Sequence, residues 1–237
     1  MNAMRAVCDV FMKIGGSVLD DDRTTKRLVP QIAALAEQYR IVLMPGGGRA
    51  AKRIKANQRA EGTDFHECWK AGVLCLEVNA KLLASYSTVF VTVTSLADVV
   101  QCQADRKVAV FAPAGAILNS VQLPRDWEVT TDSMGLHFAS AFGAARYVIV
   151  SDVHGIYERP PDEDAGLPIS QLTVDDLERL TSSKLDSAFP AYFRRYPVPT
   201  LVVNGRQPER VHAAICGRQT IGTEILEACA GRKSWAS

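Results

Sequence analysis

Residues 10–17, VFMKIGGS, and residues 41–48, IVLMPGGG, each place a glycine run directly behind an apolar run of strand length. Helical periodicity follows both glycine runs. This succession is typical of the turn from a strand into a helix in a parallel sheet, where free backbone amides face a ligand. Glycine permits such an approach because it has no side chain and reaches positive φ at little cost. The two turns predict a site for two phosphate-bearing ligands; tight turns without a ligand are the alternative.

The composition of the 237-residue chain disfavours several classes of protein. Its formal net charge is +1 and no block of lysine or arginine stands out, so nucleic acid is not an expected partner. No apolar stretch is long enough to cross a bilayer and the N-terminus lacks a signal-peptide pattern, so we expect no membrane association and a cytoplasmic location. The six cysteines show no paired C-x-x-C spacing, which disfavours structural zinc and a disulfide framework.

The rest of the chain alternates apolar runs of strand length with helical periodicity, which predicts an α/β fold built from repeated β-α units. Residues 113–124 are expected to be a connection with weak periodicity, and residues 158–168 a surface loop or hairpin. Further strands are predicted at 89–93, 108–111, 147–151 and 200–203, with a short edge strand at 222–225, and helices at 23–39, 49–60, 65–86, 96–103, 129–142, 173–180, 187–196 and 208–216. Residues 231–237 are expected to be frayed.

Four short segments, in this order, resemble the signature series of the amino acid kinase superfamily: KIGGS at 13–17, PGGG at 45–48, TDS at 131–133 and SDVHGIY at 151–157. The resemblance spans the chain nearly end to end. It implies a three-layer αβα sandwich around a mostly parallel central sheet, forming a single kinase domain over residues 1–237. An acceptor lobe would cover about 1–125 and a nucleotide lobe about 126–230. The resemblance also implies ATP and Mg²⁺ as cofactors and a homo-oligomer.

Within the superfamily, WEVTTDS at 127–133 and VVNGRQPERV at 202–211 resemble the branch that phosphorylates (5-aminomethylfuran-3-yl)methyl phosphate in methanofuran biosynthesis, a pathway of one-carbon metabolism. This implies ATP-dependent phosphorylation of a small phosphate monoester to a diphosphate. Isopentenyl phosphate kinases resemble this chain less, because Pro45 stands where they have a histidine. Two alternatives stay open: a carboxylate or nucleoside monophosphate as acceptor, or a non-catalytic storage protein that binds nucleotide or oxyanions.

Phosphoryl transfer depends on positioning and on neutralising charge rather than on covalent chemistry by the protein. The resemblance implies that Lys13 meets the β- and γ-phosphates and that Asp132 orients this lysine and approaches the Mg²⁺ shell. These two residues are the predicted catalytic pair. A solvated lysine at a strand end and an aspartate compensating a helix dipole are the corresponding structural alternatives.

The other predicted site residues divide into a nucleotide set and an acceptor set. No metal ligands are assigned, although Ser17 can offer its hydroxyl to phosphate or metal. The predicted nucleotide and phosphate ligands are Gly15, Gly16, Ser17, Asp152, Gly155, Tyr157, Asn204 and Gly205. The predicted acceptor ligands are Gly46, Gly47, Gly48 and Trp127, reinforced by Arg49 and Lys52 unless these two form an ordinary solvated helix face.

Many superfamily members have a second lysine in the later half that meets the phosphates, and its equivalent here is left unassigned. Lys184 is the nearest candidate but lacks the glycine-methionine context of those members. The alternatives for this second positive charge are Arg194, Arg195, Arg206 and a larger share for Mg²⁺. Asp126 and Asp186 are predicted neighbours of a furan acceptor or its ammonium, and His154 is given no catalytic role.

Overall fold

The computed structural model describes residues 7–159, 166–180 and 184–227, and this part of the chain contains one eight-stranded sheet with strand order β3-β4-β2-β1-β5-β7-β8-β6. All neighbouring strands run parallel except β7 and β8, which are antiparallel. The strands are β1 (Val10–Ile14), β2 (Ile41–Pro45), β3 (Phe90–Val93), β4 (Val108–Phe111), β5 (Arg146–Ser151), β6 (Gln171–Thr173), β7 (Thr200–Asn204) and β8 (Thr223–Leu226).

Strand β1 lies at the centre of the sheet, between β2 and β5 and parallel to both. In this register Ile14 lies opposite Pro45 on one side and opposite Val150 on the other. The carboxyl ends of the three strands therefore meet at one edge of the sheet. That edge is where open α/β sheets place their ligands.

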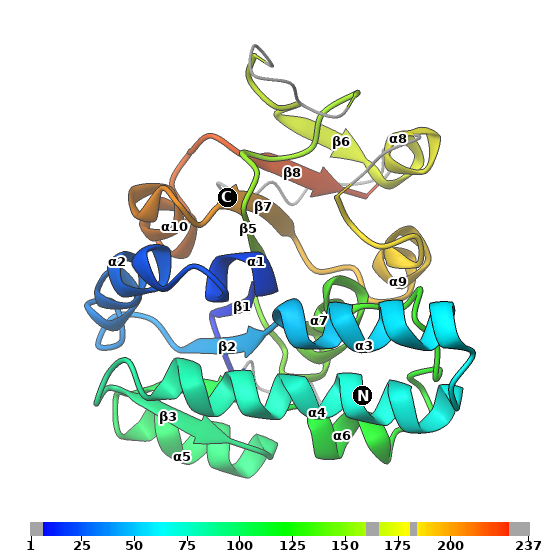
Figure 1. Ribbon diagram of the computed structural model, residues 1–237. Helices are drawn as coiled ribbons and strands as arrows, with labels where there is room; N and C mark the ends of the chain where they lie inside the picture. Colours follow the sequence, from blue (N-terminus) through cyan, green and yellow to red (C-terminus); the bar gives the residue numbers. More distant parts are fainter. Residues whose placement is uncertain (1–6, 160–165, 181–183, 228–237) are drawn as a thin grey trace, which may run out of the picture.

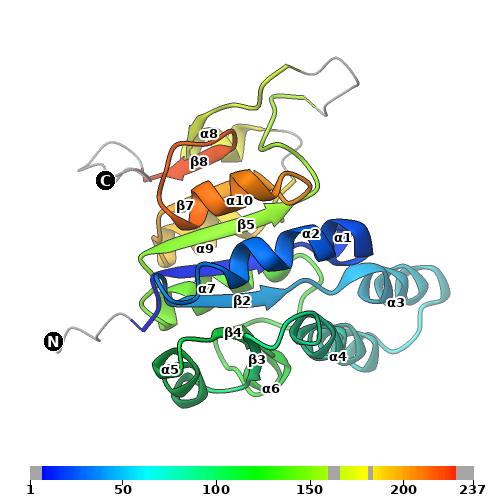
Figure 2. The ribbon, with the colours of Figure 1, turned by 90° about the vertical axis from the view of Figure 1, so that its left-hand side faces the viewer.

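Helices cover both faces of the sheet, which gives the three αβα layers. Figure 1 shows α2 and α10 on the left of the sheet and α7 and α9 on its right, and Figure 2 views the molecule from the α2 and α10 side. The helices are α1 (Gly16–Leu19), α2 (Asp22–Ala33), α3 (Gly48–Glu61), α4 (Phe65–Ala84), α5 (Leu96–Ala104), α6 (Ala114–Leu118), α7 (Thr131–Ala141), α8 (Val174–Arg179), α9 (Phe189–Arg195) and α10 (Pro208–Ile215).

Alternation along β1 separates the two layers of the core. Val10, Met12 and Ile14 pack with apolar residues of α2 and α10. Phe11 points to the opposite face, where α7 contributes to the second core cluster. Because successive side chains alternate, Lys13 lies on the same face as Phe11 and is directed toward α7.

The predicted α/β sandwich is confirmed, with local corrections. The short helix α1 follows the first glycine turn, and α6 lies within the segment expected to be a connection. The strand at Thr223–Leu226 is not an edge strand, because β6, which was not predicted, extends the sheet beyond it. The helix predicted at 23–39 is α2, which ends earlier than expected, at Ala33. Parts of the predicted 158–168 loop and all of residues 231–237 lie outside the described residues.

Within the described ranges, no helix combines the length and apolar character that crossing a bilayer requires.

Candidate active site

A cavity of about 350 Å³ opens at the carboxyl ends of β1, β2 and β5. Both predicted glycine turns line it, Gly15 and Gly16 from one turn and Gly46–Gly48 from the other. Lys13, Asp132 and Asp152 line it as well. The cavity therefore brings together the two turns, the predicted catalytic pair and Asp152, a predicted nucleotide ligand outside the turns.

The two glycine turns are in direct backbone contact. A Cβ atom placed on Gly16 would lie 2.3 Å from the amide nitrogen of Gly48, and one on Gly46 would lie 2.7 Å from the amide nitrogen of Gly16. The Gly46 amide donates to the carbonyl of Ile14 across 2.8 Å. Neither position tolerates a side chain without a shift of the backbone. The glycines are thus required by the fit of one turn against the other as well as by access for a ligand.

Helices α1 and α3 begin in these turns, and no side chain caps either helix start. The first amides of a helix have no partner within the helix and carry the positive end of its dipole. Gly48, the first residue of α3, has a φ of +63°, which a residue with a side chain rarely adopts. The 14-residue helix α3 consequently presents free amides to the cavity at its glycine start.

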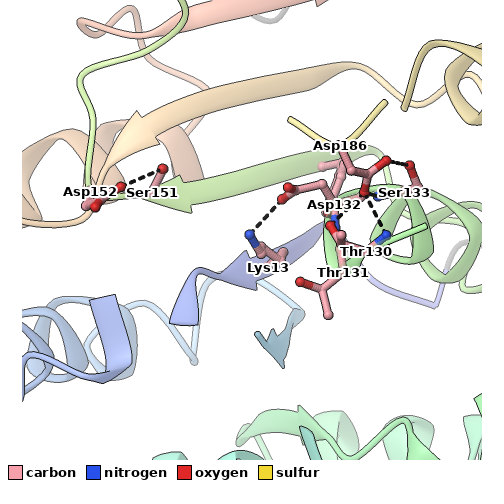
Figure 3. Close-up of polar contacts among 9 residues, drawn as sticks. Lys13, Thr130, Thr131, Asp132, Ser133, Ser151, Asp152 and Asp186 are labelled. Carbon is pink, nitrogen blue, oxygen red and sulfur yellow. Dashed lines mark hydrogen bonds and ion pairs between the residues drawn. The ribbon is translucent and has the colours of Figure 1, made fainter. Parts of the chain in front are cut away.

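Lys13 and Asp132 form a buried ion pair in the wall of the cavity. Lys13 Nζ lies 2.6 Å from Asp132 Oδ1, and the two side chains are 11% and 9% exposed. Figure 3 shows Lys13, at the end of β1, directed to Asp132 on α7. The carboxylate compensates the ammonium and fixes its direction, so the lysine charge is held at the cavity rather than in bulk water.

The first turn of α7 holds Asp132 in place. Thr130 is the N-cap, and its hydroxyl accepts from the Asp132 amide. The hydroxyl of Tyr147 on β5 donates to the Asp132 carbonyl at 3.0 Å. Gly135 makes room for this hydroxyl, because a Cβ there would lie 2.0 Å from it. The start of α7, which carries Asp132 of the ion pair, is therefore fixed to β5 of the sheet.

Asp186 anchors the same helix start and does not line the cavity, contrary to its prediction as a neighbour of the acceptor. It accepts from the amides of Thr130 and Ser133 at 3.0 and 3.1 Å and also from both hydroxyls. Burial, and then the nearby charge of Asp132, raise the pKa of Asp186 above its usual value, although hydrogen bonds from Ser133 and from the Thr130 hydroxyl act in the opposite direction. Figure 3 shows Ser133 turned toward Asp186. Asp186 is a structural residue that positions α7.

An apolar wall closes the cavity on the side of α4. Trp69, Val73 and Leu76 of this helix follow the periodicity of a buried face, and they are buried but also line the cavity. Trp127 lines it too, with its ring against Gly72, where a Cβ would lie 2.9 Å from the ring. Trp127 Nε1 donates to Gln58 Oε1 on α3 at 3.3 Å. This wall offers a flat apolar surface to a ligand beside the second glycine turn.

The predicted nucleotide residues divide between the cavity and its surroundings. Gly15, Gly16, Ser17 and Asp152 line the cavity. The other four, Gly155, Tyr157, Asn204 and Gly205, are not among the residues lining it.

The surroundings of these outer residues are well defined. The Asn204 side-chain amide contacts His154 Nδ1 at 3.1 Å, and Arg210 contacts the same nitrogen at 2.6 Å. Gly205 packs against the Val150 side chain, and a Cβ on this glycine would lie 2.7 Å from that side chain. Their assignment to the nucleotide stays a prediction.

Three further lysines line the cavity besides Lys13: Lys52, Lys55 and Lys184. Lys55 was not predicted; its Nζ donates to the Trp127 carbonyl and lies 3.6 Å from Glu128. Lys184, left unassigned for lack of sequence context, faces the same cavity as Lys13.

The predicted arginines are placed differently. Arg49 turns away from the cavity to Asp20, donating to its carbonyl at 2.9 Å. Arg194 forms ion pairs with Asp175 and Glu178. Neither these two nor Arg195 and Arg206 line the cavity.

The sequence of this chain is similar to those of characterised kinases. It is 27% identical to the [5-(aminomethyl)furan-3-yl]methyl phosphate kinase of Methanocaldococcus jannaschii, over 91% of this chain and 97% of the relative. It is also 27% identical to the uridylate kinase of Methanothrix thermoacetophila, over 91% of this chain and 98% of the relative. Both relatives are named for kinase activity on a phosphate-bearing compound.

Solved structures support the fold. The uridylate kinase from Archaeoglobus fulgidus superimposes with a TM-score of 0.73 at 22% identity, covering 92% of this chain and 99% of that one. The UMP kinase from Bacillus anthracis gives a TM-score of 0.74 at 17% identity, covering 94% and 97%. The profile of the group described as "Amino acid kinase family" matches residues 10–194. With that match over most of its length, the chain belongs to the amino acid kinase family.

Proposed function

We propose that this protein is a kinase that transfers the γ-phosphoryl group of ATP to a small phosphate monoester and so forms a diphosphate. The observation that carries the proposal is the contact between the two glycine turns around the Lys13–Asp132 pair in one cavity. Donor and acceptor phosphates bound at adjacent turns would lie head to head. Phosphoryl transfer needs such alignment together with positive charge at the moving group.

The donor phosphates would bind at the first turn. The amides at Gly15 and Gly16 and the Ser17 hydroxyl are placed to contact the β- and γ-phosphates. The Lys13 ammonium would stay in contact with the phosphoryl group during its transfer, because it is a compact charge on a flexible stem. Lys184 is our candidate for the second positive charge, because it lines the cavity whereas the three candidate arginines do not.

The acceptor phosphate would bind at the second turn and the start of α3, with Lys52 beside it. Its organic part would then lie against Trp127 and the apolar face of α4. Residues 10–17 and residues 126–134 contribute to the same cavity. We retain the assignment of an acceptor lobe to about 1–125 and a nucleotide lobe to about 126–230 as a proposal, with Trp127 contributed across that boundary.

Mg²⁺ is implied by the use of ATP. It commonly binds proteins through one or two carboxylates together with substrate phosphates and water. In the described residues no three His, Cys, Asp or Glu side chains gather into a metal site, but Asp152 suits such a role. It lines the cavity at the end of β5, and within the described ranges its carboxylate accepts a side-chain hydrogen bond from the Ser151 hydroxyl alone, at 3.4 Å. The ion would neutralise phosphate charge during transfer.

The acceptor we favour is [5-(aminomethyl)furan-3-yl]methyl phosphate, the compound named in the Methanocaldococcus relative, which would place the protein in methanofuran biosynthesis. UMP is the second candidate, because several relatives are uridylate kinases. A carboxylate acceptor and a storage role have less support. The glycine start of α3 suits a phosphate on the acceptor, and the intact Lys13–Asp132 pair suits catalysis.

Steady-state kinetics with a panel of acceptors tests this assignment. We expect ATP-dependent ADP formation with the furan monophosphate at a higher kcat/KM than with UMP. Hydroxylamine, which traps acyl phosphates, should yield no adduct when carboxylates are offered. A higher kcat/KM for UMP would transfer the assignment to the second candidate, and trapped hydroxamate would contradict a phosphate acceptor.

We also propose that the protein forms a homodimer through α4. Leu74, Val78 and Leu82 are 49%, 64% and 48% exposed and follow one another at helical spacing along a single stripe. Glu77 and Lys81 lie beside this stripe. Antiparallel pairing of two copies about a twofold axis at Val78 would bury the stripe and bring Glu77 of one copy near Lys81 of the other. The pairing would thus combine apolar contact along the stripe with opposite charges beside it.

Val78→Asp is expected to convert the dimer to a monomer, because it places a charge at the centre of the buried stripe. Light scattering after size-exclusion chromatography measures the mass directly. Val121→Asp is the matched control, since Val121 is fully exposed at 100% and lies outside α4. A wild-type monomer, or a Val78→Asp dimer, would contradict the proposed interface.

A further inference from the structure

Charged side chains of both signs line the cavity along α3, including Lys55, whose Nζ donates to the Trp127 carbonyl. Gly48 and Lys52 lie at the start of this helix, next to Lys13 and the two glycine turns. Gln58, which contacts Trp127, lies roughly 15 Å beyond Gly48 along the helix axis, at 1.5 Å per residue. The residue before Trp127 is Asp126, and it lines the cavity as well. Asp126 is therefore adjacent in sequence to the residue that contacts α3 far from its glycine start.

Asp126 carries a charge that no described side chain neutralises. Its Oδ1 accepts from the Glu128 amide at 2.9 Å, which fixes the direction of the carboxylate. No lysine or arginine of the described residues forms an ion pair with it. The neighbouring Glu128, by contrast, pairs with Lys55 at 3.6 Å and with Arg59 at 2.8 Å. Asp126 is thus the carboxylate of this segment that is available to a ligand.

The other carboxylates of the cavity have different surroundings. Asp132 is engaged by Lys13, and Asp152 lies at the end of β5 beside the first glycine turn. Asp126 instead precedes Trp127 in the sequence and lines the same cavity as the apolar face of α4. A carboxylate beside an aromatic wall suits an ammonium group carried on a small ring, because the carboxylate provides the charge-assisted hydrogen bond and the wall excludes water.

We propose that Asp126 determines specificity for acceptors that carry a cationic amine at the end opposite their phosphate. This inference rests on the proposed function and deepens it, because it predicts discrimination between amine-bearing acceptors and neutral ones of the same size. The amine would donate to Asp126 while the phosphate occupies the second glycine turn. A neutral acceptor leaves the carboxylate without a partner and gains nothing from it.

The test compares two ligands that differ only in this group, [5-(aminomethyl)furan-3-yl]methyl phosphate and its hydroxymethyl analogue. Their dissociation constants are measured by calorimetry with the wild-type protein and with Asp126→Asn. We expect the wild type to bind the amine about tenfold more tightly than the alcohol. In Asp126→Asn this ratio should approach one, through weaker binding of the amine and little change for the alcohol.

Glu128→Gln is the matched control, because it removes a neighbouring carboxylate that is already paired, and it should keep the wild-type ratio. An unchanged amine preference in Asp126→Asn overturns the inference, as does a wild type without the preference. Tight binding of the amine with no ADP formation would defeat the proposed function alone. Turnover of both ligands with an unchanged ratio would defeat the role of Asp126 alone, and binding of neither ligand would overturn both.

Discussion

Lys13→Ala is expected to lower kcat by about 100- to 1,000-fold, because it removes the positive charge that we propose contacts the transferred group. The KM for the acceptor should change little, since the acceptor contacts that we propose are at the second glycine turn and the α4 wall, which line the cavity apart from Lys13. A coupled assay of ADP formation measures both quantities. Lys26→Ala is the matched control, because Lys26 also pairs with an aspartate, Asp22, but both side chains are exposed. Wild-type rates in Lys13→Ala would show that the catalytic charge lies elsewhere.

The same change should also reduce stability, because it leaves the Asp132 carboxylate buried without its partner. Removing one member of a buried ion pair typically costs about 3–5 kcal/mol. The double variant Lys13→Met/Asp132→Asn removes both charges and is expected to recover most of that loss in urea unfolding, while its activity stays low. This combination separates the catalytic role of the lysine from its part in folding. Recovery of activity in the double variant would contradict that role.

Gly16→Ala is expected to impair activity nearly as strongly, because the two turns leave no room for a methyl group. The added Cβ would lie 2.3 Å from the nitrogen and 2.5 Å from the Cα of Gly48, so the turns must separate. A displacement of about 1 Å can cost about 100-fold in rate, and overpacking typically costs about 1–3 kcal/mol. We expect the KM values of ATP and acceptor to rise together, since the contact joins the two turns at which we propose that they bind.

Gly115→Ala provides the control for Gly16→Ala. A Cβ on Gly115 in α6 meets no atom within 4 Å, so the substitution should keep both activity and stability. Steady-state kinetics and urea unfolding of the two variants give the comparison. Wild-type kcat/KM in Gly16→Ala would mean that the contact between the turns is not needed for catalysis.

The features predicted correctly from the sequence are those with a local signal. A glycine run behind an apolar run identifies a strand end, and parallel neighbours bring such ends to one edge of the sheet. Lys13 and Asp132 were paired by resemblance, and alternation along β1 directs the lysine to the face that α7 covers. A threonine cap of α7 was also predictable, as Thr130 or Thr131, because threonine before a helix with an aspartate in its first turn is a common start signal; the structure has Thr130.

The features that were missed depend on contacts between distant segments. Asp186 hydrogen bonds to Thr130, which is 56 residues away, so no local pattern shows that it anchors α7. Lys184 lies between α8 and α9 in the sequence and has no motif of its own. Trp69, Val73 and Leu76 have the periodicity of a buried face, which does not distinguish a core from the wall of a cavity.

Phosphorus NMR of the reaction mixture tests the central claim most directly, namely that the two glycine turns align a donor and an acceptor phosphate for transfer. ATP, Mg²⁺ and [5-(aminomethyl)furan-3-yl]methyl phosphate are incubated with the wild-type protein. The account predicts loss of the monophosphate resonance and growth of two coupled doublets from a new diphosphate, in step with ADP. ADP and free phosphate with an unchanged monophosphate resonance, here and with UMP, would contradict it.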